Sequence, residues 1–185
     1  MFPIRTAAGL LALAALSGCL AKNTGPSTEE ETGFRGAYRM DSWTRSAITA
    51  GTTTINPATG NADSAAFIYA VDLGRSSGGV TERYATYQTT AASAGQVSFR
   101  WQYNCYHAFF QTNAKLVFFV ETPSGQRAET VAVDQAVSGG GHFDGTISLS
   151  VQAGDKFGMI VGGRNYDSDG RLMGDVSLMD FDAPR

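Results

Sequence analysis

From Phe34 onward, hydrophobic and polar residues alternate with a period of two in several short stretches. In residues 97–103 the odd-numbered side chains are large and apolar, and the even-numbered ones are polar. Successive side chains of a β-strand point to opposite faces, so this pattern predicts a strand with one buried face. The same alternation recurs in residues 146–151, and no stretch after residue 33 shows apolar residues at helical spacing with caps. Helix is therefore expected to be a minor component.

Two runs, residues 116–120 and 157–161, would place apolar residues on both faces of a strand, which is typical of central strands in a covered sheet. Clusters of Gly, Pro, Ser and Asp separate the strand-like stretches and predict turns. We expect an all-β domain, an antiparallel β-sandwich or jelly roll of about nine or ten short strands. The further predicted strands are residues 34–43, 66–73, 80–88, 127–133 and 172–181, and the predicted turns are 123–125, 139–141, 153–155 and 167–170.

The first residues have the pattern of a secretory signal peptide. Arg5 precedes an apolar run over residues 7–16, which is shorter than the roughly 20 residues that a membrane-spanning helix needs. Residues 1–18 are therefore excluded from the folded domain. The next segment, residues 20–33, is polar and rich in turn-forming residues, as expected for a flexible tether. The predicted organisation is a signal peptide (1–18), a tether that begins at residue 19 (19–33) and a single β-sandwich domain (34–185).

The four residues Leu16-Ser17-Gly18-Cys19 resemble the lipobox of bacterial lipoproteins. This resemblance implies that Cys19 receives a diacylglycerol and becomes the mature N-terminus, so that the protein binds a membrane through palmitate-type acyl chains. The alternative is an ordinary signal peptide with an incidental cysteine. In the lipoprotein family an Asp after the lipidated Cys retains the protein at the inner membrane. The residue here is Leu20, which implies the outer membrane in a host that has one.

The C-terminal half resembles a jelly-roll domain of exported bacterial proteins, many of which carry a PEP-type sorting tail. The resemblance rests on residues 95–103 (GQVSFRWQY), 153–158 (AGDKFG) and 174–184 (GDVSLMDFDAP). It implies an extracytoplasmic β-sandwich and brings no established catalytic residues with it.

The charge pattern excludes a nucleic-acid partner. Charged residues make up 17% of the chain, the formal net charge is −3, and no basic stripe is present. The longest run of like charge is Glu29-Glu30-Glu31, which is acidic. Aromatic residues make up 11% of the chain, enough to build a core.

One loop has the beginning of a calcium-binding motif. Asn165, Asp167 and Asp169 place side-chain oxygens at alternate positions and are followed by Gly170, as in the first half of the D-x-[DN]-x-[DN]-G loop. The bidentate Glu of the motif is missing, because its position is occupied by Val176. Calcium bound by Asn165, Asp167 and Asp169 is one interpretation, and a hairpin turn without an ion is the other. Calcium is the only cofactor that the sequence suggests.

Cys105 and His107 are two residues apart and would share a strand face, which could form a thiolate–base pair. However, Cys105 continues the apolar odd-numbered series that contains Phe99 and Trp101, so we expect it to be buried and unreactive. No disulfide within one mature chain is expected, since the only other cysteine is Cys19.

Exposed aromatic side chains would suit a sugar ligand, and three residues are candidates for a ligand-binding platform: Trp43, Tyr106 and His107. Tyr106 and Phe110 have the parity opposite to the apolar series and are expected to face outward, whereas Trp101 and Tyr103 face inward. Packing in the core is the alternative role for all of these aromatics.

The sequence favours a protein that is not an enzyme. It has two His and none of the common hydrolase motifs, such as H-E-x-x-H or G-x-S-x-G. The first hypothesis is a lipid-anchored binding or adhesive module of the bacterial cell envelope with a carbohydrate or protein ligand. The second is a structural or accessory component of an envelope assembly, and the third is a glycan-active hydrolase. Exposed aromatics beside a sheet would favour the first hypothesis, and a free strand edge the second.

Overall fold

The computed structural model describes residues 30–47, 53–55, 59–60, 64–72, 81–165 and 171–185. Strands dominate this part of the chain, and its only helical elements are two 3-10 turns, as the sequence predicts. The elements in chain order are β1 (Glu30–Thr32), η1 (Gly36–Tyr38), η2 (Met40–Ser42), β2 (Thr44–Ala47), β3 (Thr53–Ile55), β4 (Thr59–Gly60), β5 (Ser64–Asp72), β6 (Thr81–Thr90), β7 (Gly95–Glu121), β8 (Arg127–Val151), β9 (Lys156–Asn165) and β10 (Arg171–Pro184).

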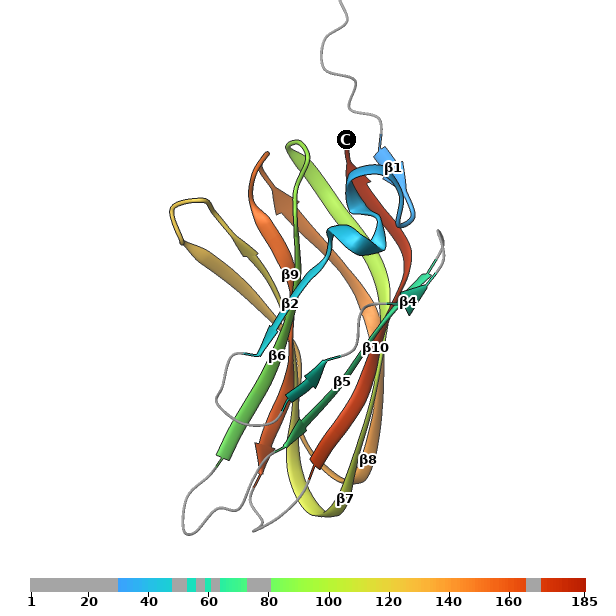
Figure 1. Cartoon of the computed structure of the whole chain (residues 1–185), viewed down its shortest axis with the longest axis vertical. Coiled ribbons are helices and arrows are strands. Elements are labelled where there is room, and N and C mark those ends of the chain that lie inside the picture. The colour runs from blue at the N-terminus through green and yellow to red at the C-terminus, as the bar shows by residue number, and fades with distance from the viewer. Residues whose placement is uncertain (1–29, 48–52, 56–58, 61–63, 73–80, 166–170) are drawn as a thin grey trace, which may run out of the picture.

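The described strands form one antiparallel sheet that folds over into two facing layers (Figure 1). The strand order is β2-β6-β9-β7-β10-β5-β3, with β8 paired to β7, β1 to β10 and β4 to β5. Strand β7 belongs to both layers, because its first half pairs with β10 and its second half with β9. The sandwich architecture predicted from the sequence is confirmed.

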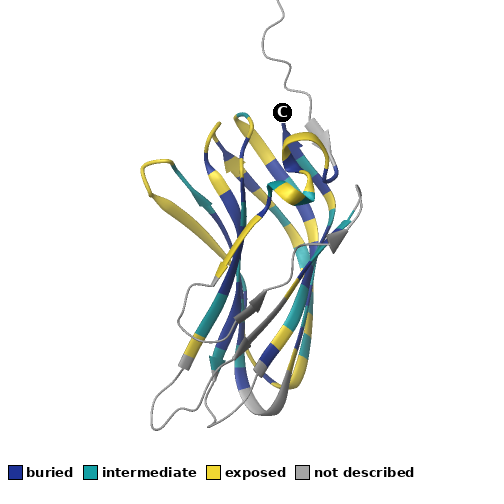
Figure 2. Cartoon of the chain, viewed as in Figure 1, coloured by how far each residue is buried: buried dark blue, intermediate teal, exposed yellow. Residues whose placement is uncertain are grey.

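The core lies between the two layers, where aromatic rings from both meet. Phe99 and Phe118, from the two halves of β7, pack edge to face with their ring centroids 5.2 Å apart. Phe67 of β5 and Tyr87 of β6 pack in the same way at 5.0 Å. Along the strands of Figure 2, buried and exposed residues alternate, which is the periodicity read from the sequence.

Three predictions of local structure are wrong. Residues 97–103 and 116–120 are not two short strands but parts of one strand of 27 residues, β7. The predicted turn at 139–141 lies inside β8, where Gly140 and Gly141 pair with Tyr106 and Cys105. Gly139 has φ +78°, which glycine adopts without steric cost, and it lies where the β7–β8 register shifts. These glycines bend a continuous ribbon from one layer into the other instead of ending it.

The third wrong prediction is a strand over residues 34–43, which instead contains η1 and η2. Its buried residues are Phe34, Tyr38 and Trp43, four and five positions apart, so a strand of period two could not bury all three on one face. The two turns bring all three rings onto the core. Gly36, the first residue of η1, has φ +53°, a backbone conformation that glycine adopts without steric cost.

Candidate functional site

An exposed aromatic side chain, Tyr106, lies on the outward side of the first half of β7. The odd-numbered residues Val97, Phe99, Trp101, Tyr103 and Cys105 are all buried, as predicted from their alternation. Tyr106 has the opposite parity and is 52% exposed. Its outward position is therefore confirmed.

Two further apolar side chains lie beside Tyr106 on neighbouring strands. Met173 of β10 is its direct cross-strand partner, and Ile68 of β5 lies one strand further, opposite Asp175. Met173 and Ile68 are each 40% exposed. On its other side Tyr106 faces Gly140 of β8, which has no side chain to cover the ring. Tyr106 and Met173 thus form an exposed apolar pair across β7 and β10, and Ile68 lies in the adjacent cross-strand row, next to Asp175.

A cross-strand row of hydrogen-bonded polar side chains runs next to the Tyr106–Met173 pair and ends at Ile68. Asn104 lies opposite His142 of β8 and opposite Asp175 of β10. The Asn104 amide Nδ2 donates to Asp175 Oδ2 at 3.2 Å, and the Asn104 carbonyl Oδ1 lies 2.6 Å from His142 Nδ1. We call these six residues the Tyr106 face: Tyr106, Met173, Ile68, Asn104, His142 and Asp175.

The hydrogen bonds determine which groups of the polar row remain available to a ligand. A carbonyl oxygen only accepts, so His142 Nδ1 carries the proton and donates to Asn104 Oδ1. In the neutral imidazole this leaves Nε2 as an acceptor. Asp175 contributes a second acceptor, and Asn104 is held in one orientation between the two. The face therefore offers oriented acceptors beside an exposed ring.

Trp43, predicted as part of a ligand platform, lies in the core instead. It is 8% exposed, its ring lies 5.0 Å from Phe67 between centroids, and further contacts with Phe157 and Phe181 enclose it. Its indole N–H donates to the carbonyl of Tyr38 at 3.3 Å. A large ring satisfied at its polar edge and covered on its faces has no surface left for a ligand.

The other sequence candidates have different outcomes. His107 pairs through its backbone with Leu172, and its side chain lies outside the described residues. Asn165 is the last residue of β9, whereas Asp167 and Asp169 lie outside the described part of the chain, as does Cys19. Within the described residues no three His, Cys, Asp or Glu side chains gather as a metal site. Calcium binding and lipidation stay predictions.

Cys105 is a buried free thiol that is 6% exposed. Burial raises the pKa of this thiol, and hydrogen bonds with Tyr103 and the backbone of Gly141 oppose that rise only in part. A raised pKa keeps the group protonated, and the thiolate is the nucleophilic form. Cys105 is therefore a small core residue, as its strand parity predicts.

Sequence reasoning did not find Asn104, His142, Asp175, Met173 or Ile68. The parity of Asn104 with Tyr106 was a usable signal, because residues two apart on a strand share a face. The other four come from three different strands, and only the register of β5, β8 and β10 brings them together.

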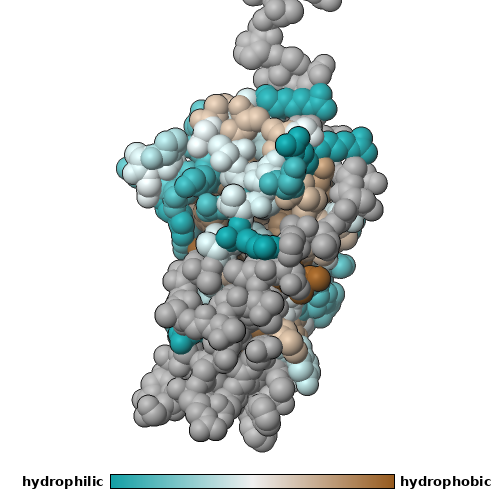
Figure 3. Space-filling model, in the orientation of Figure 1, coloured by the Kyte–Doolittle hydropathy of each residue, from teal (hydrophilic) through white to brown (hydrophobic). Residues whose placement is uncertain are grey.

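Figure 3 shows the surface of the molecule from the viewpoint of Figure 1. There, hydrophilic residues are interspersed with small hydrophobic areas, and the described residues show no broad apolar surface. Among the described residues no helix is long and apolar enough to cross a membrane.

No family model and no curated protein matches the chain. Several solved structures share part of its architecture. The chain covers 91% of TmCBM61, solved with β-1,4-galactotriose, at 14% identity and a TM-score of 0.39 over 80% of its own length. It covers 91% of a family 22 carbohydrate-binding module of Clostridium thermocellum Xyn10B at 10% identity and a TM-score of 0.41, again over 80% of its length. The chain covers 89% of the cellulose-binding domain of Cellulomonas fimi β-1,4-glucanase C at 12% identity and a TM-score of 0.40, over 77% of its own length. At these TM-scores the likeness transfers neither a ligand nor a binding residue to this chain.

Proposed function

We propose that this protein is a non-catalytic binding module that holds a glycan on the Tyr106 face. The observation that carries the proposal is the half-exposed Tyr106 ring beside the row formed by His142, Asn104 and Asp175. The apolar face of a sugar ring stacks on an aromatic side chain, while its hydroxyl groups need oriented hydrogen-bond partners. The Tyr106 face supplies both within neighbouring strands.

The site is an open surface, and this favours a chain of sugars over a single one. Met173 and Ile68 add exposed apolar positions on two further strands, in two adjacent cross-strand rows of the Tyr106 face. An extended ligand can therefore contact several positions, each contributing a modest free energy. We infer weak binding by any one sugar unit and stronger binding by an oligosaccharide.

The position of the Tyr106 face suits an anchored protein. The tether predicted for residues 19–33 enters the domain at β1, which pairs with residues 182–184 at the end of β10. Met173, opposite Tyr106, lies nine residues earlier on β10, which is about 30 Å at roughly 3.3 Å per residue. A domain anchored through Cys19 would hold the Tyr106 face away from the membrane (Figure 1).

The glycan proposal is tested on an array of oligosaccharides with Tyr106→Ala, Tyr106→Phe and Asn104→Ala. We expect Tyr106→Ala to weaken the best glycan at least about tenfold and Tyr106→Phe to keep most of the affinity, because phenylalanine retains the ring face. Val131→Ala is the matched control, since Val131 is 57% exposed on β8 and outside the site. Equal binding by Tyr106→Ala and wild type would refute the assignment of this face.

The anchor has a separate test. We propose that Cys19 carries the lipid, on the resemblance of residues 16–19 to a lipobox. Cys19→Ser is expected to abolish incorporation of labelled fatty acid and to change the fractionation of the protein. Labelling that persists in Cys19→Ser would contradict the lipoprotein assignment, whatever the outcome of the glycan array.

A further inference from the structure

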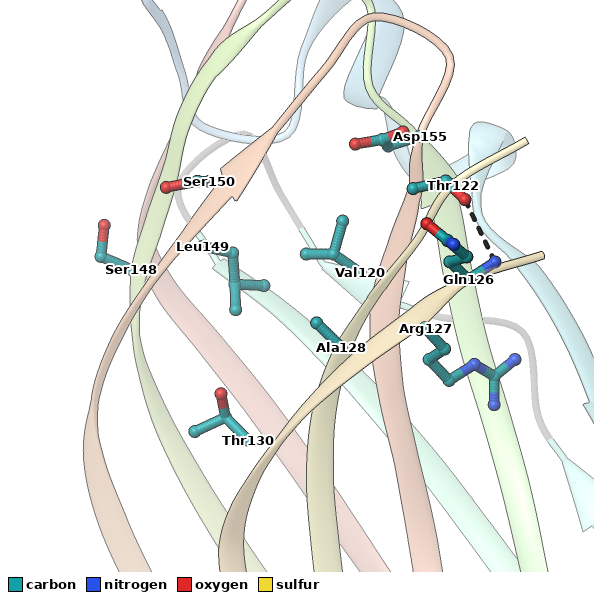
Figure 4. Close-up of a pocket in the computed structure, with 10 residues that line it drawn as sticks. All are labelled: Val120, Thr122, Gln126, Arg127, Ala128, Thr130, Ser148, Leu149, Ser150 and Asp155. Carbon is teal, nitrogen blue, oxygen red and sulfur yellow. Dashed lines mark hydrogen bonds between the residues drawn. The ribbon is translucent and has the colours of Figure 1, made fainter. Parts of the chain in front are cut away.

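A groove with a volume of about 500 Å³ lies between the two ends of the folded β7–β8 ribbon, whereas Tyr106 lies near the middle of that ribbon. In Figure 4, Val120, Ala128 and Leu149 form its apolar floor, while hydroxyl-bearing residues such as Thr130 and Ser150 lie along its sides. Figure 1 shows the cause of the opening, because the hairpin that joins β7 to β8 leans away from the body of the sandwich.

Exposure along the hairpin shows where the two layers separate. Phe118 and its cross-strand partner Thr130 both face the interior, yet Phe118 is fully buried and Thr130 is exposed. Ala128, opposite Val120, is exposed as well. Side chains that would be core residues in a closed sandwich are therefore accessible from the groove.

Strand β8 borders this opening in both layers. It pairs with β7 along its whole length, and no other described strand pairs with its second edge. Within the hairpin the Thr122 N–H donates to the Gln126 carbonyl. Hydrogen-bonded and non-hydrogen-bonded pairs alternate in an antiparallel ladder, so Arg127 and Glu129 direct their backbone N–H and C=O groups away from β7. These groups can accept a further strand.

The groove also holds a carboxylate with unused hydrogen-bonding capacity. Asp155 is 5% exposed, and its Oδ2 accepts the N–H of Gln152 at 2.8 Å. No donor among the described residues reaches its other oxygen. A buried carboxylate is stabilised by hydrogen-bond donors and above all by a cation.

The nearby guanidinium does not supply that cation. Arg127 donates from Nε and Nη2 to Glu121 Oε2 at 2.9 and 2.5 Å, and its guanidinium carbon lies 4.5 Å from the centre of the Phe119 ring. A second carboxylate, Glu129, lies 3.9 Å from it. Figure 4 shows the Arg127 side chain directed away from Asp155. Arg127 is therefore engaged by two other carboxylates and does not neutralise Asp155.

We propose that this groove binds an extended, basic segment of a partner protein by strand addition to β8. The backbone of the segment pairs with the free edge at Arg127 and Glu129, its small apolar side chains cover Val120 and Leu149, and a lysine or arginine reaches Asp155. Strand addition uses main-chain hydrogen bonds for affinity and side-chain pockets for specificity, which is the combination found here. This site is separate from the Tyr106 face and independent of glycan binding.

The test uses the full chain, purified in detergent, and blocked peptides of about seven alternating Thr and Val residues. The central residue is Lys, Arg, norleucine or Glu, and the readout is the methyl NMR signals of Val120 and Leu149. We expect the Lys and Arg peptides to shift both signals and to bind about tenfold more tightly than the norleucine peptide, since a charge-assisted hydrogen bond is lost. Asp155→Asn keeps an acceptor for the Gln152 N–H and should abolish this preference.

The edge is tested by Glu129→Pro, which removes an outward N–H without removing a β7–β8 hydrogen bond and should weaken every peptide at least about tenfold. Peptides N-methylated on the amides that would face β8 give the same test without altering the protein. Tyr106→Ala should leave peptide binding unchanged. The proposal is overturned if the methyl signals do not shift at about 1 mM peptide, or if the Lys and norleucine peptides bind equally. It is also overturned if a neutral hexasaccharide, or self-association of the protein, shifts the same methyl signals.

Discussion

Removing one buried hydroxyl group by Tyr38→Phe tests how the N-terminal segment is held on the sandwich. Tyr38 is fully buried, and its hydroxyl donates to the Pro184 carbonyl at 2.5 Å and accepts the Ala92 N–H at 3.0 Å. Phenylalanine keeps the ring contacts with Phe157 and Phe181. The substitution therefore removes two hydrogen bonds and very little packing.

The magnitude follows from the surroundings of the two partners. Pro184 is buried, so its carbonyl would be left without a partner, at about 1 to 3 kcal/mol. Ala92 is exposed, and water can replace the hydroxyl at about 0.5 to 1 kcal/mol. We expect Tyr38→Phe to lower the free energy of unfolding by about 1.5 to 4 kcal/mol, or the melting temperature by roughly 3 to 16 °C for a domain of this size.

The same substitution at two other tyrosines provides matched controls. The Tyr87 hydroxyl donates to the Ile68 carbonyl at 2.7 Å, and Tyr87→Phe is expected to cost about 1 kcal/mol. Tyr106 is half exposed, and Tyr106→Phe should lie within about 0.5 kcal/mol of wild type. Urea titrations followed by tryptophan fluorescence give all three values. If Tyr38→Phe is no less stable than Tyr106→Phe, the bridge between the two ends of the chain does not stabilise the fold.

Three further predictions concern packing, pH and calcium. Gly158→Ala would place a Cβ 2.0 Å from the backbone oxygen of Tyr87 and should lower stability by about 1 to 3 kcal/mol; Gly125→Ala, with open space but φ +85°, should cost only about 1 kcal/mol, and equal losses in chemical denaturation would contradict the close approach of β9 to β6. Burial raises the pKa of Tyr87 above its ordinary value of 10.0, so the folded state keeps a proton that the unfolded state releases; stability is full below pH 10 and should fall above it by about 1.4 kcal/mol per pH unit, a slope that Tyr87→Phe should reduce in alkaline denaturation. Should Asn165, Asp167 and Asp169 bind calcium with a Kd of about 0.1 to 1 mM, then about 10 mM calcium should raise the melting temperature by about 3 to 11 °C. The variant with Asp167→Ala and Asp169→Ala should lose that increment, and an unchanged wild-type melting curve would leave only the hairpin-turn interpretation.

Local alternation was sufficient to predict the inward face of β7 and the outward position of Tyr106. Strand parity depends only on neighbouring residues, so the burial of Trp101 and Cys105 could be read directly from their positions. The antiparallel sandwich followed in the same way from many alternating stretches separated by turn residues. The same reasoning failed for Trp43, because its aromatic character does not say whether a turn or a strand carries it.

Only the tertiary structure decided which strands lie side by side, and both proposed sites depend on that. His142, Asn104 and Asp175 come from β8, β7 and β10, and their hydrogen bonds exist because the β7–β8 and β7–β10 registers place all three side by side. The groove arises because the continuous β7–β8 ribbon bends at Gly139 and its hairpin leans away from the sandwich. From the sequence alone, the glycines at 139–141 indicate only a turn. Pairing between distant strands is a non-local property, so period and composition determine the faces of each strand but not its neighbours.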